Sequence, residues 1–437
     1  MIKRYAFLAV LSIGLIVISM SGCQKMLTQI PFLNPSKEPG AAIDATPAPT
    51  SAYSMTQAPS QVPGTGEELS IWLPPQFDPN NGTPAGDLFK AQLEKFSTDN
   101  PGISIKIRVK MENGSGGMLD SLTTASAAAP SVLPGIVILS RADLESAAQN
   151  GLLFPLEPAD LDLDYEDMFL YARDMGKTRE AAYGVPFAGN ALVLEYKPMQ
   201  IGYPPMNWRD ILQQKTIVAF PAADPKGLIP LLLYQQVGGI FTGDEEDVML
   251  DEIPLQRSLQ IIADGTTANI FPYWLTEYMT FDQSQQALID SSAAYAIVWT
   301  SQYLNSQSDS LTIASLPVVE NHIMTFADGW VLAFPQTSTE SYLAHLKLAE
   351  YLIDPAFHQM WSEAAGVLPV SRTVLSGWSN QGLSKTLSPI AESARLIPSN
   401  KDIESLGPLL STACQGLIRK QISYIQASNT ILKELSE

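Results

Sequence analysis

The chain has 437 residues, a length that predicts two or three domains. Hydrophobic residues make up 46% of it and charged residues 16%, which excludes a disordered polar chain. Its 45 acidic and 26 basic residues give a net charge of −19, which repels phosphate backbones and argues against nucleic acid as a partner. Two cysteines and three histidines predict neither a disulfide framework nor a metal cluster.

The N-terminal segment has the pattern of an export signal. Lys3 and Arg4 precede an uncharged apolar stretch, 5–22, whose last residues are small and are followed by Cys23. The segment resembles a bacterial lipoprotein signal peptide over residues 1–22, in which the thiol of Cys23 is acylated. The alternative is an uncleaved membrane anchor, because the stretch is long enough to cross a bilayer of ~30 Å. Both interpretations place the body of the protein outside the cytoplasm and tie it to a membrane.

Residues 23–66 are predicted to form a disordered tether that begins with the lipidated cysteine. They are rich in Pro, Ala, Ser and Thr, and they lack the apolar periodicity that offsets the entropy of ordering a chain. Proline keeps such a segment extended. A folded body that begins near Glu67 would therefore be held away from the membrane surface. With lipid on Cys23, Cys414 is expected to be a buried apolar residue without a disulfide partner.

The first part of the body alternates strands with helices. The apolar patterns predict, in chain order, a strand at 69–73, a helix at 87–96, a strand at 103–109, a helix at 118–129, a strand at 136–139 and a helix at 142–150. This order is typical of a mainly parallel sheet covered by helices. Ligands of such sheets bind beyond the carboxyl ends of the strands, which puts Trp72 and the turn at Ser140 and Arg141 on a candidate binding edge.

A second α/β pattern begins with the long extended run 183–196. The predicted elements that follow are a helix at 208–213, a strand at 217–220, helices at 228–237 and 284–289, strands at 293–299, 311–319 and 325–333, a helix at 342–352 and a last helix at 409–435. We find no internal repeat with a fixed period. The body as a whole is therefore predicted to be α/β.

Three short motifs give the body a family likeness. YGVPF at 183–187 leads into ALVLEYK at 191–197, AAYAI at 293–297 precedes Trp299, and GVLPV lies at 366–370. In order and spacing they resemble the extracellular solute-binding proteins of bacterial ABC importers, family 1, of the sugar type. Lys197 departs from the pattern, which commonly has Asn at that position.

The resemblance implies a two-lobe periplasmic-binding-protein-like fold of type II, with mixed sheets flanked by helices and lobes joined by crossing strands. The implied boundaries are an N-lobe of 67–190 with 327–365 and a C-lobe of 191–326 with 366–437. Such lobes close around a ligand by hinge motion, because contacts from both lobes exist only in the closed state.

Seven residues are candidate ligand contacts because sugar sites combine aromatic faces with hydrogen-bonding groups. They are Trp72, Asn190, Tyr234, Trp299, Asp328, Gly329 and Trp330. Trp72 and Trp299 end predicted strands, and the resemblance places Trp299 and Asn190 at the ligand. Core packing is the alternative role for each aromatic residue, and a strand-edge role is the alternative for Asn190.

Other chemistry finds little support in the sequence. The glycine-rich loop 113–117 lacks the lysine of a phosphate-binding loop, and the acidic run 244–247 lacks the spacing of a calcium loop. No nucleophile–base arrangement is evident, so no catalytic residue, metal ligand or cofactor is predicted. Paired carboxylates of a glycosidase stay open, because only folding brings such partners together.

The sequence therefore predicts a lipid-anchored, monomeric receptor outside the cytoplasm, at the cell surface or in the periplasm. It would capture a small solute, a sugar or oligosaccharide, and deliver it to the transmembrane subunits of an ABC permease. The alternatives are a secreted carbohydrate-active enzyme and a degenerate pair of lobes that serves signalling or adhesion. Polyamines, peptides and metal chelates also stay open as ligands, because they bind to the same two-lobe plan.

Overall fold

The computed structural model describes residues 67–157, 161, 163–178, 181–242, 248–306, 308–319, 323–335 and 342–437. All of them fall in one unit of the chain, Pro63–Glu437. The predicted signal peptide, Cys23, the tether and the acidic run 244–247 lie outside the described residues. None of the helices in the described ranges combines the length and the apolar character needed to span a membrane.

One mixed sheet forms the centre of the fold, with the strand order β2-β1-β3-β10-β4-β8-β5. Strand β11 (Ala394–Leu396) also pairs with β10, and β9 (Thr312–Ala314) with β4. The strands of the main order are β1 (Glu67–Leu73), β2 (Ile103–Val109), β3 (Ile136–Ser140), β4 (Gly184–Tyr196), β5 (Val218–Ala219), β8 (Tyr295–Trp299) and β10 (Thr325–Ala333). A separate hairpin joins β6 (Phe241–Thr242) to β7 (Met249–Leu250).

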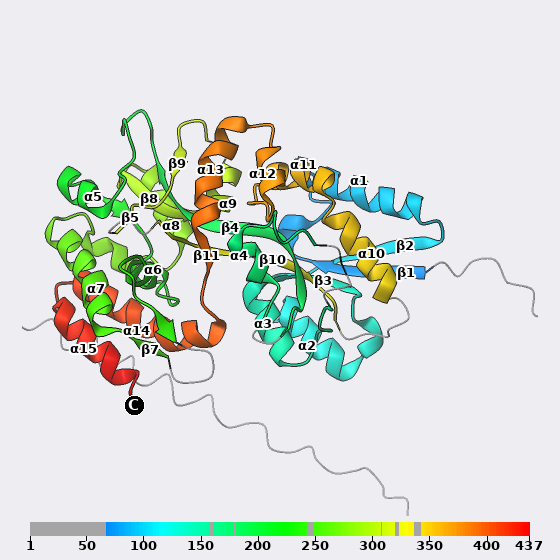
Figure 1. The fold of residues 1–437 in the computed structure, drawn as a ribbon, viewed down its shortest axis with the longest axis horizontal. Helices are drawn as coiled ribbons and strands as arrows, with labels where there is room; N and C mark the ends of the chain where they lie inside the picture. The colour runs from blue at the N-terminus through cyan, green and yellow to red at the C-terminus, as the bar shows by residue number, and fades with distance from the viewer. Residues whose placement is uncertain are drawn as a thin grey trace, which may run out of the picture. The chain divides into compact units, whose positions relative to one another are not determined.

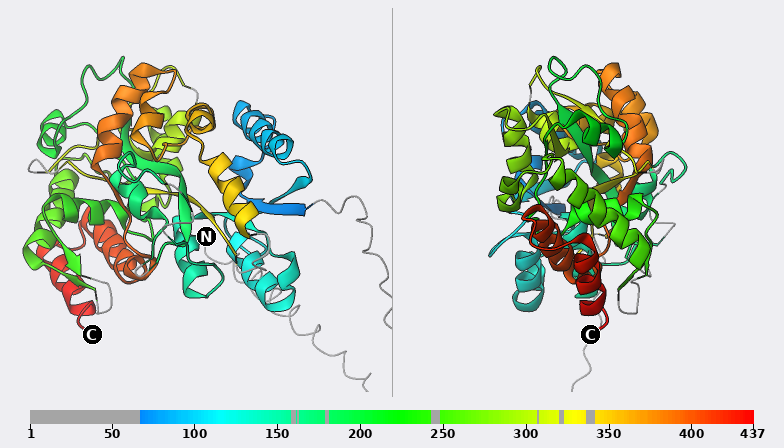
Figure 2. Two further views of the ribbon diagram at one scale, coloured as in Figure 1. Left: turned by 45° about the vertical axis from the view of Figure 1, so that its right-hand side comes forward. Right: turned by 90° about the vertical axis from the view of Figure 1, so that its left-hand side faces the viewer.

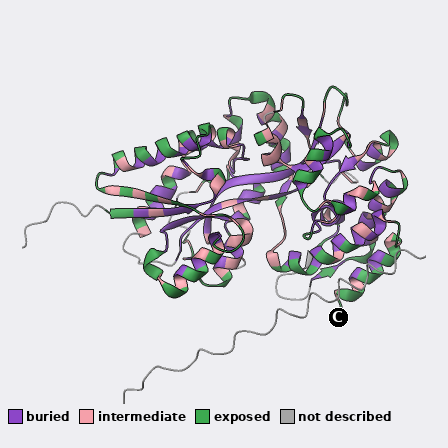
Figure 3. Cartoon of the chain, turned by 180° about the vertical axis from the view of Figure 1, so that it is seen from behind, coloured by how far each residue is buried: buried purple, intermediate pink, exposed green. Residues whose placement is uncertain are grey.

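Strand β4 links two parts of the sheet. From Gly184 to Ala191 it pairs antiparallel with β10, and from Leu192 to Tyr196 it pairs antiparallel with β8. On the far side of β10 lie β3, β1 and β2, which run parallel to one another. Every residue of β4 is buried, as the purple ribbon in Figure 3 shows.

Helices cover both faces of the parallel strands (Figure 1). Figures 1 and 2 show α1 (Pro84–Asp99) on one face, with α10 (Tyr342–Leu352) and α11 (Pro355–Ala365) beside it. The opposite face carries α2 (Met118–Ala128) and α3 (Arg141–Gln149). The pleat of β1 explains this arrangement, because Leu69, Ile71 and Leu73 join the core under α1 while Trp72 joins the core under α2 and α3.

Around β8 and β5 the helices form a second group. Helices α6 (Leu228–Gln236), α7 (Glu252–Thr267), α14 (Asn400–Ile418) and α15 (Tyr424–Glu434) pack on one another, and α8 (Phe281–Ile289) packs on β8. The remaining helices are α4 (Leu170–Met175), α5 (Trp208–Gln214), α9 (Thr300–Ser306), α12 (Arg372–Ser376) and α13 (Gln381–Ser393), with 3-10 turns η1 (Pro75–Phe77), η2 (Pro130–Val132) and η3 (Tyr273–Glu277).

Two sequence-based element assignments were wrong. The predicted last helix at 409–435 is two helices, because Lys420 adopts a left-handed φ of 56° and Ser423 caps a new helix with a capping box to Gln426. The predicted strand at 311–319 is only β9, and it stops well before Pro317. The strand predicted at 103–109 coincides with β2.

Candidate binding site

A cavity of about 450 Å³ lies where the ends of several strands meet the loops before the helices. We call it the central cavity. Residues from both groups of elements line it: Glu112, Asn113, Ser140, Ala142, Asp143, Asn190, Asp224, Lys226, Leu228, Met279, Thr280, Phe281, Asp282, Trp299, Gln302, Asp328, Gly329 and Trp330. The lining thus spans the strands on either side of β4.

Two half-buried tryptophans present their rings to this cavity. Trp299 is the last residue of β8 and packs edge-on against Phe281, with 5.6 Å between the ring centroids. Trp330 lies in β10 and packs edge-on against Phe77, with 5.4 Å between the centroids. The indole N–H of Trp330 also donates to Glu112 Oε1. Both rings are therefore held in place while part of each stays accessible to a ligand.

Asn190 lines the cavity, but its side chain already has partners. Its Oδ1 accepts hydrogen bonds from Thr300 Oγ1 (2.8 Å) and from the backbone N–H of Ser301 (3.0 Å). Its Nδ2 donates to Ser301 Oγ at 2.9 Å. The amide therefore ties β4 to the start of α9, which agrees with the strand-edge alternative and leaves one N–H for a ligand.

Gly329 allows β10 to pass close to β4 and α4. It pairs with Gly189, and a Cβ at position 329 would overlap the carbonyl oxygen of Ala188 and the sulfur of Met175. The neighbouring Asp328 is half-buried, and its Oδ1 accepts from the backbone N–H of Gly329 at 2.8 Å. The glycine thus serves close strand packing, and the aspartate faces the cavity beside it.

Carboxyl groups dominate the titratable part of the lining. The pKa of Asp143 is raised to about 6, mainly by burial; the hydrogen bond from Ser140 lowers it, the nearby carboxylates of Glu112 and Asp328 raise it, and Lys226 lowers it slightly. Burial likewise raises the pKa of Asp328, partly offset by Lys226. The pKa of Asp224 is raised by burial as well, although the backbone N–H groups of Lys226 and Leu228 stabilise its charged form.

Of the seven residues predicted to contact a ligand, the structure brings five together in the central cavity: Asn190, Trp299, Asp328, Gly329 and Trp330. Trp72 and Tyr234 lie outside its lining. Trp72 is 2% exposed, because β1 is paired on both edges and its side chain enters the core beneath α2 and α3. Tyr234 is fully buried, and its hydroxyl donates to the carbonyl of Ile240 at 2.7 Å. Both take the core-packing alternative.

The sequence interpretation missed most of the charged lining. Asp143 lies in the first turn of α3, directly after the strand end at Ser140 that was placed on the candidate edge. That position was a usable signal for Asp143. Glu112, Asp224, Lys226 and Asp282 come from loops and a helix start that only the folded chain brings to one cavity. Within the described ranges, no group of three or more His, Cys, Asp or Glu side chains is arranged to hold a metal ion.

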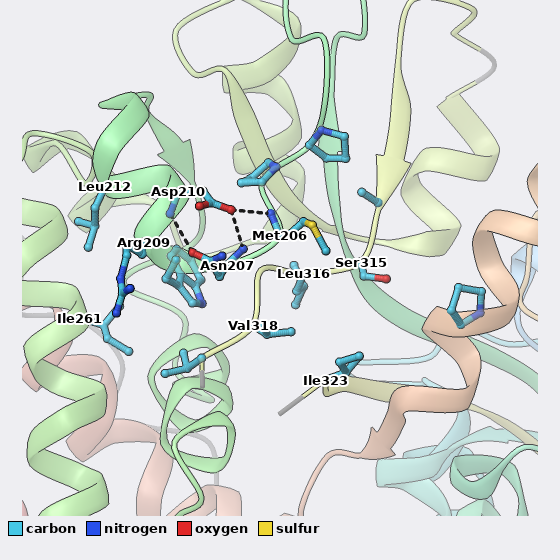
Figure 4. Close-up of a pocket in the computed structure, with 16 residues that line it drawn as sticks. Met206, Asn207, Arg209, Asp210, Leu212, Ile261, Ser315, Leu316, Val318 and Ile323 are labelled. Carbon is cyan, nitrogen blue, oxygen red and sulfur yellow. Dashed lines mark hydrogen bonds between the residues drawn. The ribbon is translucent and has the colours of Figure 1, made fainter. Parts of the chain in front are cut away.

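A larger cavity, of about 1100 Å³, lies between the loop before α5 and the segment after β9 (Figure 4). Asn207 and Asp210 line it, but they form the capping box of α5: Asn207 Oδ1 accepts from the N–H of Asp210 (3.0 Å), and Asp210 Oδ2 accepts from the N–H of Asn207 (3.3 Å). Its lining comes from one side of β4 only, and its tryptophan, Trp208, is 5% exposed. The central cavity is the better candidate, because two half-buried tryptophans, Trp299 and Trp330, line it.

Residues 91–383 match the family of bacterial extracellular solute-binding proteins, and the chain belongs to this family. Membership confirms the resemblance inferred from the motifs, and it places the protein outside the cytoplasm. It also confirms the prediction that the chain is not an enzyme, against the alternative of a carbohydrate-active enzyme.

Solved structures confirm the predicted fold. The cyclic α-maltosyl-1,6-maltose binding protein of Arthrobacter globiformis is similar with a TM-score of 0.68 at 15% identity, over 84% of this chain and 97% of its own. The sugar-binding protein MalE of Xanthomonas citri is similar with a TM-score of 0.67 at 17% identity, with the same coverage. A solute-binding protein of Thermotoga lettingae, bound to α-D-tagatose, has a TM-score of 0.64 at 17% identity, over 84% and 100%. No curated protein matches the chain.

Proposed function

We propose that the protein is a membrane-tethered receptor that captures a small solute in the central cavity and delivers it to an ABC permease. The observation that carries the proposal is the position of Trp299 and Trp330. They reach one cavity from β8 and β10, the two strands that pair with successive halves of β4. A ligand between the two rings would contact both parts of the sheet at once.

The two lobes are proposed to be 67–190 with 327–365 and 191–326 with 366–437, with β4 and β10 as the crossing strands. Helix packing supports this division. Helices α10 and α11 pack on α1, which supports the proposal that 342–365 belongs to the first lobe, and α14 packs on α6 and α7, which supports the proposal that α14 belongs to the second. Hinge motion between the lobes would open and close the central cavity.

The solute is proposed to be a sugar or oligosaccharide. The three similar structures described above are, by their names, proteins that bind cyclic maltosyl-maltose, sugar and tagatose. Trp299 and Trp330 would stack on the apolar faces of sugar rings, while Asp328 and the free N–H of Asn190 would bind hydroxyls. Gly329 would let a ligand approach the backbone of β10. Trp72 and Tyr234 would stabilise the lobes rather than contact the solute.

Membrane attachment and transport complete the proposal. Cys23 would carry the lipid, residues 24–66 would form the tether, and the monomeric receptor would dock on the transmembrane subunits of the permease. The small-residue pattern before Cys23 and the family of the body support this part.

Titration of the purified protein with a panel of monosaccharides and oligosaccharides, followed by tryptophan fluorescence, tests the proposed function. We expect a saturable change with at least one sugar class, because two lining residues are tryptophans. A signal that stays flat with sugars, amino sugars, polyamines and peptides alike would contradict the proposal.

A further inference from the structure

The charge balance of the central cavity is strongly negative. Five carboxyl groups line it, against the single ammonium group of Lys226. The five are Glu112, Asp143, Asp224, Asp282 and Asp328. These carboxyl groups lie in the same lining as Trp299 and Trp330, so they affect which solute the cavity accepts.

Three of these carboxyl groups already have partners within the protein. Asp224 accepts from two backbone N–H groups at the start of α6, and Asp282 Oδ1 accepts from Gln302 Nε2 at 2.7 Å. Glu112 Oε1 accepts from the indole of Trp330 and from Gln76 Nε2. These contacts hold the three groups in place at the wall.

Asp143 and Asp328 each have one hydrogen-bond partner within the protein, as Asp282 does. Asp143 has the hydroxyl of Ser140 as its hydrogen-bond partner, and Asp328 uses one oxygen for the N–H of Gly329. The two carboxyl groups disfavour each other's charge, and Glu112 disfavours the charge of both. Lys226 favours the charge of Asp328, and so does Arg141, whose guanidinium is also paired with Glu145 at 2.6 Å.

Closure of the lobes would remove water from these charges. A buried carboxylate without a cation is costly, and a neutral hydroxyl donates a hydrogen bond without compensating the charge. A cation on the solute would compensate it, and the faces of tryptophan rings, two of which line the cavity, attract cations as well.

We propose that the natural solute is a sugar that carries a protonated amine, with the ammonium group held by Asp143 and Asp328 near the faces of Trp299 and Trp330. This inference rests on the proposed function, since it specifies the solute of the same cavity.

The pH dependence of the affinity distinguishes a neutral sugar from a sugar with an ammonium group. It would be helped when Asp143 takes up a proton, so its affinity would rise as pH falls. An ammonium group would instead favour the ionised carboxylates and displace protons on binding, so its affinity would rise with pH. The groups that bear on the pKa of Asp143 in this window are Ser140, which lowers it by a hydrogen bond, and the charges of Glu112, Asp328 and Lys226.

The test is calorimetric titration of the full chain with a glucosamine disaccharide and with its N-acetylated form, at pH 5 to 6.5 and fixed ionic strength. We expect the amine form to bind at least about tenfold more tightly, with an affinity that rises by up to about tenfold per pH unit. Spermidine, a cation without hydroxyls, is expected to bind more weakly than the amine sugar.

Two substitutions test whether Asp143 and Asp328 cause the preference for the amine form. Asp143→Asn and Asp328→Asn keep the shape and a hydrogen-bonding oxygen, and each is expected to reduce the preference for the amine form by about tenfold. Asp143→Asn should also flatten the pH dependence. Glu94→Gln removes an exposed carboxylate on α1, outside the cavity, and should change neither quantity. Thermal unfolding of each variant shows that it folds.

The outcomes separate this inference from the proposed function. Equal or tighter binding of the N-acetylated form, or an affinity that rises as pH falls, would overturn the inference and leave a sugar receptor in place. Stronger binding of spermidine than of the amine sugar would overturn it in favour of a polyamine. Failure of every probe to bind, neutral sugars included, would overturn the proposed function itself.

Discussion

Glu195 is a buried carboxyl group near the C-terminal end of β4. Both of its oxygens lie 3.2 Å from Gln285 Nε2, and burial raises its pKa from 4.5 to about 7. Between these two pH values the folded protein holds a proton that the unfolded chain has released. Stability therefore falls as pH rises through this window, and it is constant above it.

Glu195→Gln removes the free-energy cost of ionising a buried carboxyl group, and it keeps the size of the side chain. At pH 8 we expect the variant to be more stable than the parent by about 3 kcal/mol, and at pH 4 to be equal to it. Urea unfolding at the two pH values measures the difference. Glu94→Gln, an exposed carboxylate on α1, serves as the control. A parent protein whose stability does not change between pH 4.5 and 7 would show that Glu195 does not titrate as described.

The two cavity tryptophans are expected to carry much of the binding energy. Trp299→Ala and Trp330→Ala should each weaken binding by about 1–3 kcal/mol, because buried aromatic anchors dominate most binding sites. Trp274→Ala is the matched control, since Trp274 packs on Tyr278 outside the cavity lining. Calorimetry with the best solute gives the comparison. Similar losses in all three variants would mean that the effect is one of folding rather than of contact.

At the level of elements, the paired glycines of β4 and β10 set how closely these strands pass α4. Gly329→Ala should destabilise the protein by about 2 kcal/mol, because the new methyl group overlaps a backbone carbonyl and the sulfur of Met175. Gly202→Ala should be close to neutral, since nothing lies within 4 Å of the added atom. Thermal unfolding of both variants tests this. Equal melting temperatures would contradict the account of β10.

Much of the element order could be predicted from local pattern. Strict alternation located β2 to the residue, and the motif at 183–187 located the long strand β4. The break between α14 and α15 could not be predicted, because Lys420 is an ordinary helix former that adopts a left-handed conformation only in the folded chain.

Residues of the site could be predicted from the sequence only where the positions of the strands could be predicted. Trp299 was predicted because it ends a strand, and Trp330 because it lies where the chain is expected to return between the lobes. Trp72 also ends a strand, but β1 is flanked by β2 and β3, and its pleat sends the ring into the core. Which face of a strand meets a ligand depends on neighbours that are distant in sequence. The same limit applies to Glu112 and Lys226, which only folding brings together.

On the scale of the whole molecule, Cys23 is the proposed point of attachment to the membrane. Cys23→Ser should move the protein from the membrane fraction to the soluble fraction, because the proposed lipid is attached to this one side chain. Fractionation and intact mass measurement check this. A variant that stays with the membrane would favour the uncleaved anchor.

The central claim is that two lobes close on the solute in the central cavity. Spin labels at Ser115 and Glu277, exposed positions near the Asn113 and Met279 sides of the cavity, report on the width of the opening. In a Cys23→Ser background the remaining thiol, Cys414, is fully buried, and burial raises its pKa to about 12, so it resists labelling. Pulsed electron–electron resonance with and without saturating solute should show a shorter and narrower distance distribution in the bound state. An unchanged distribution at saturation would contradict the claim.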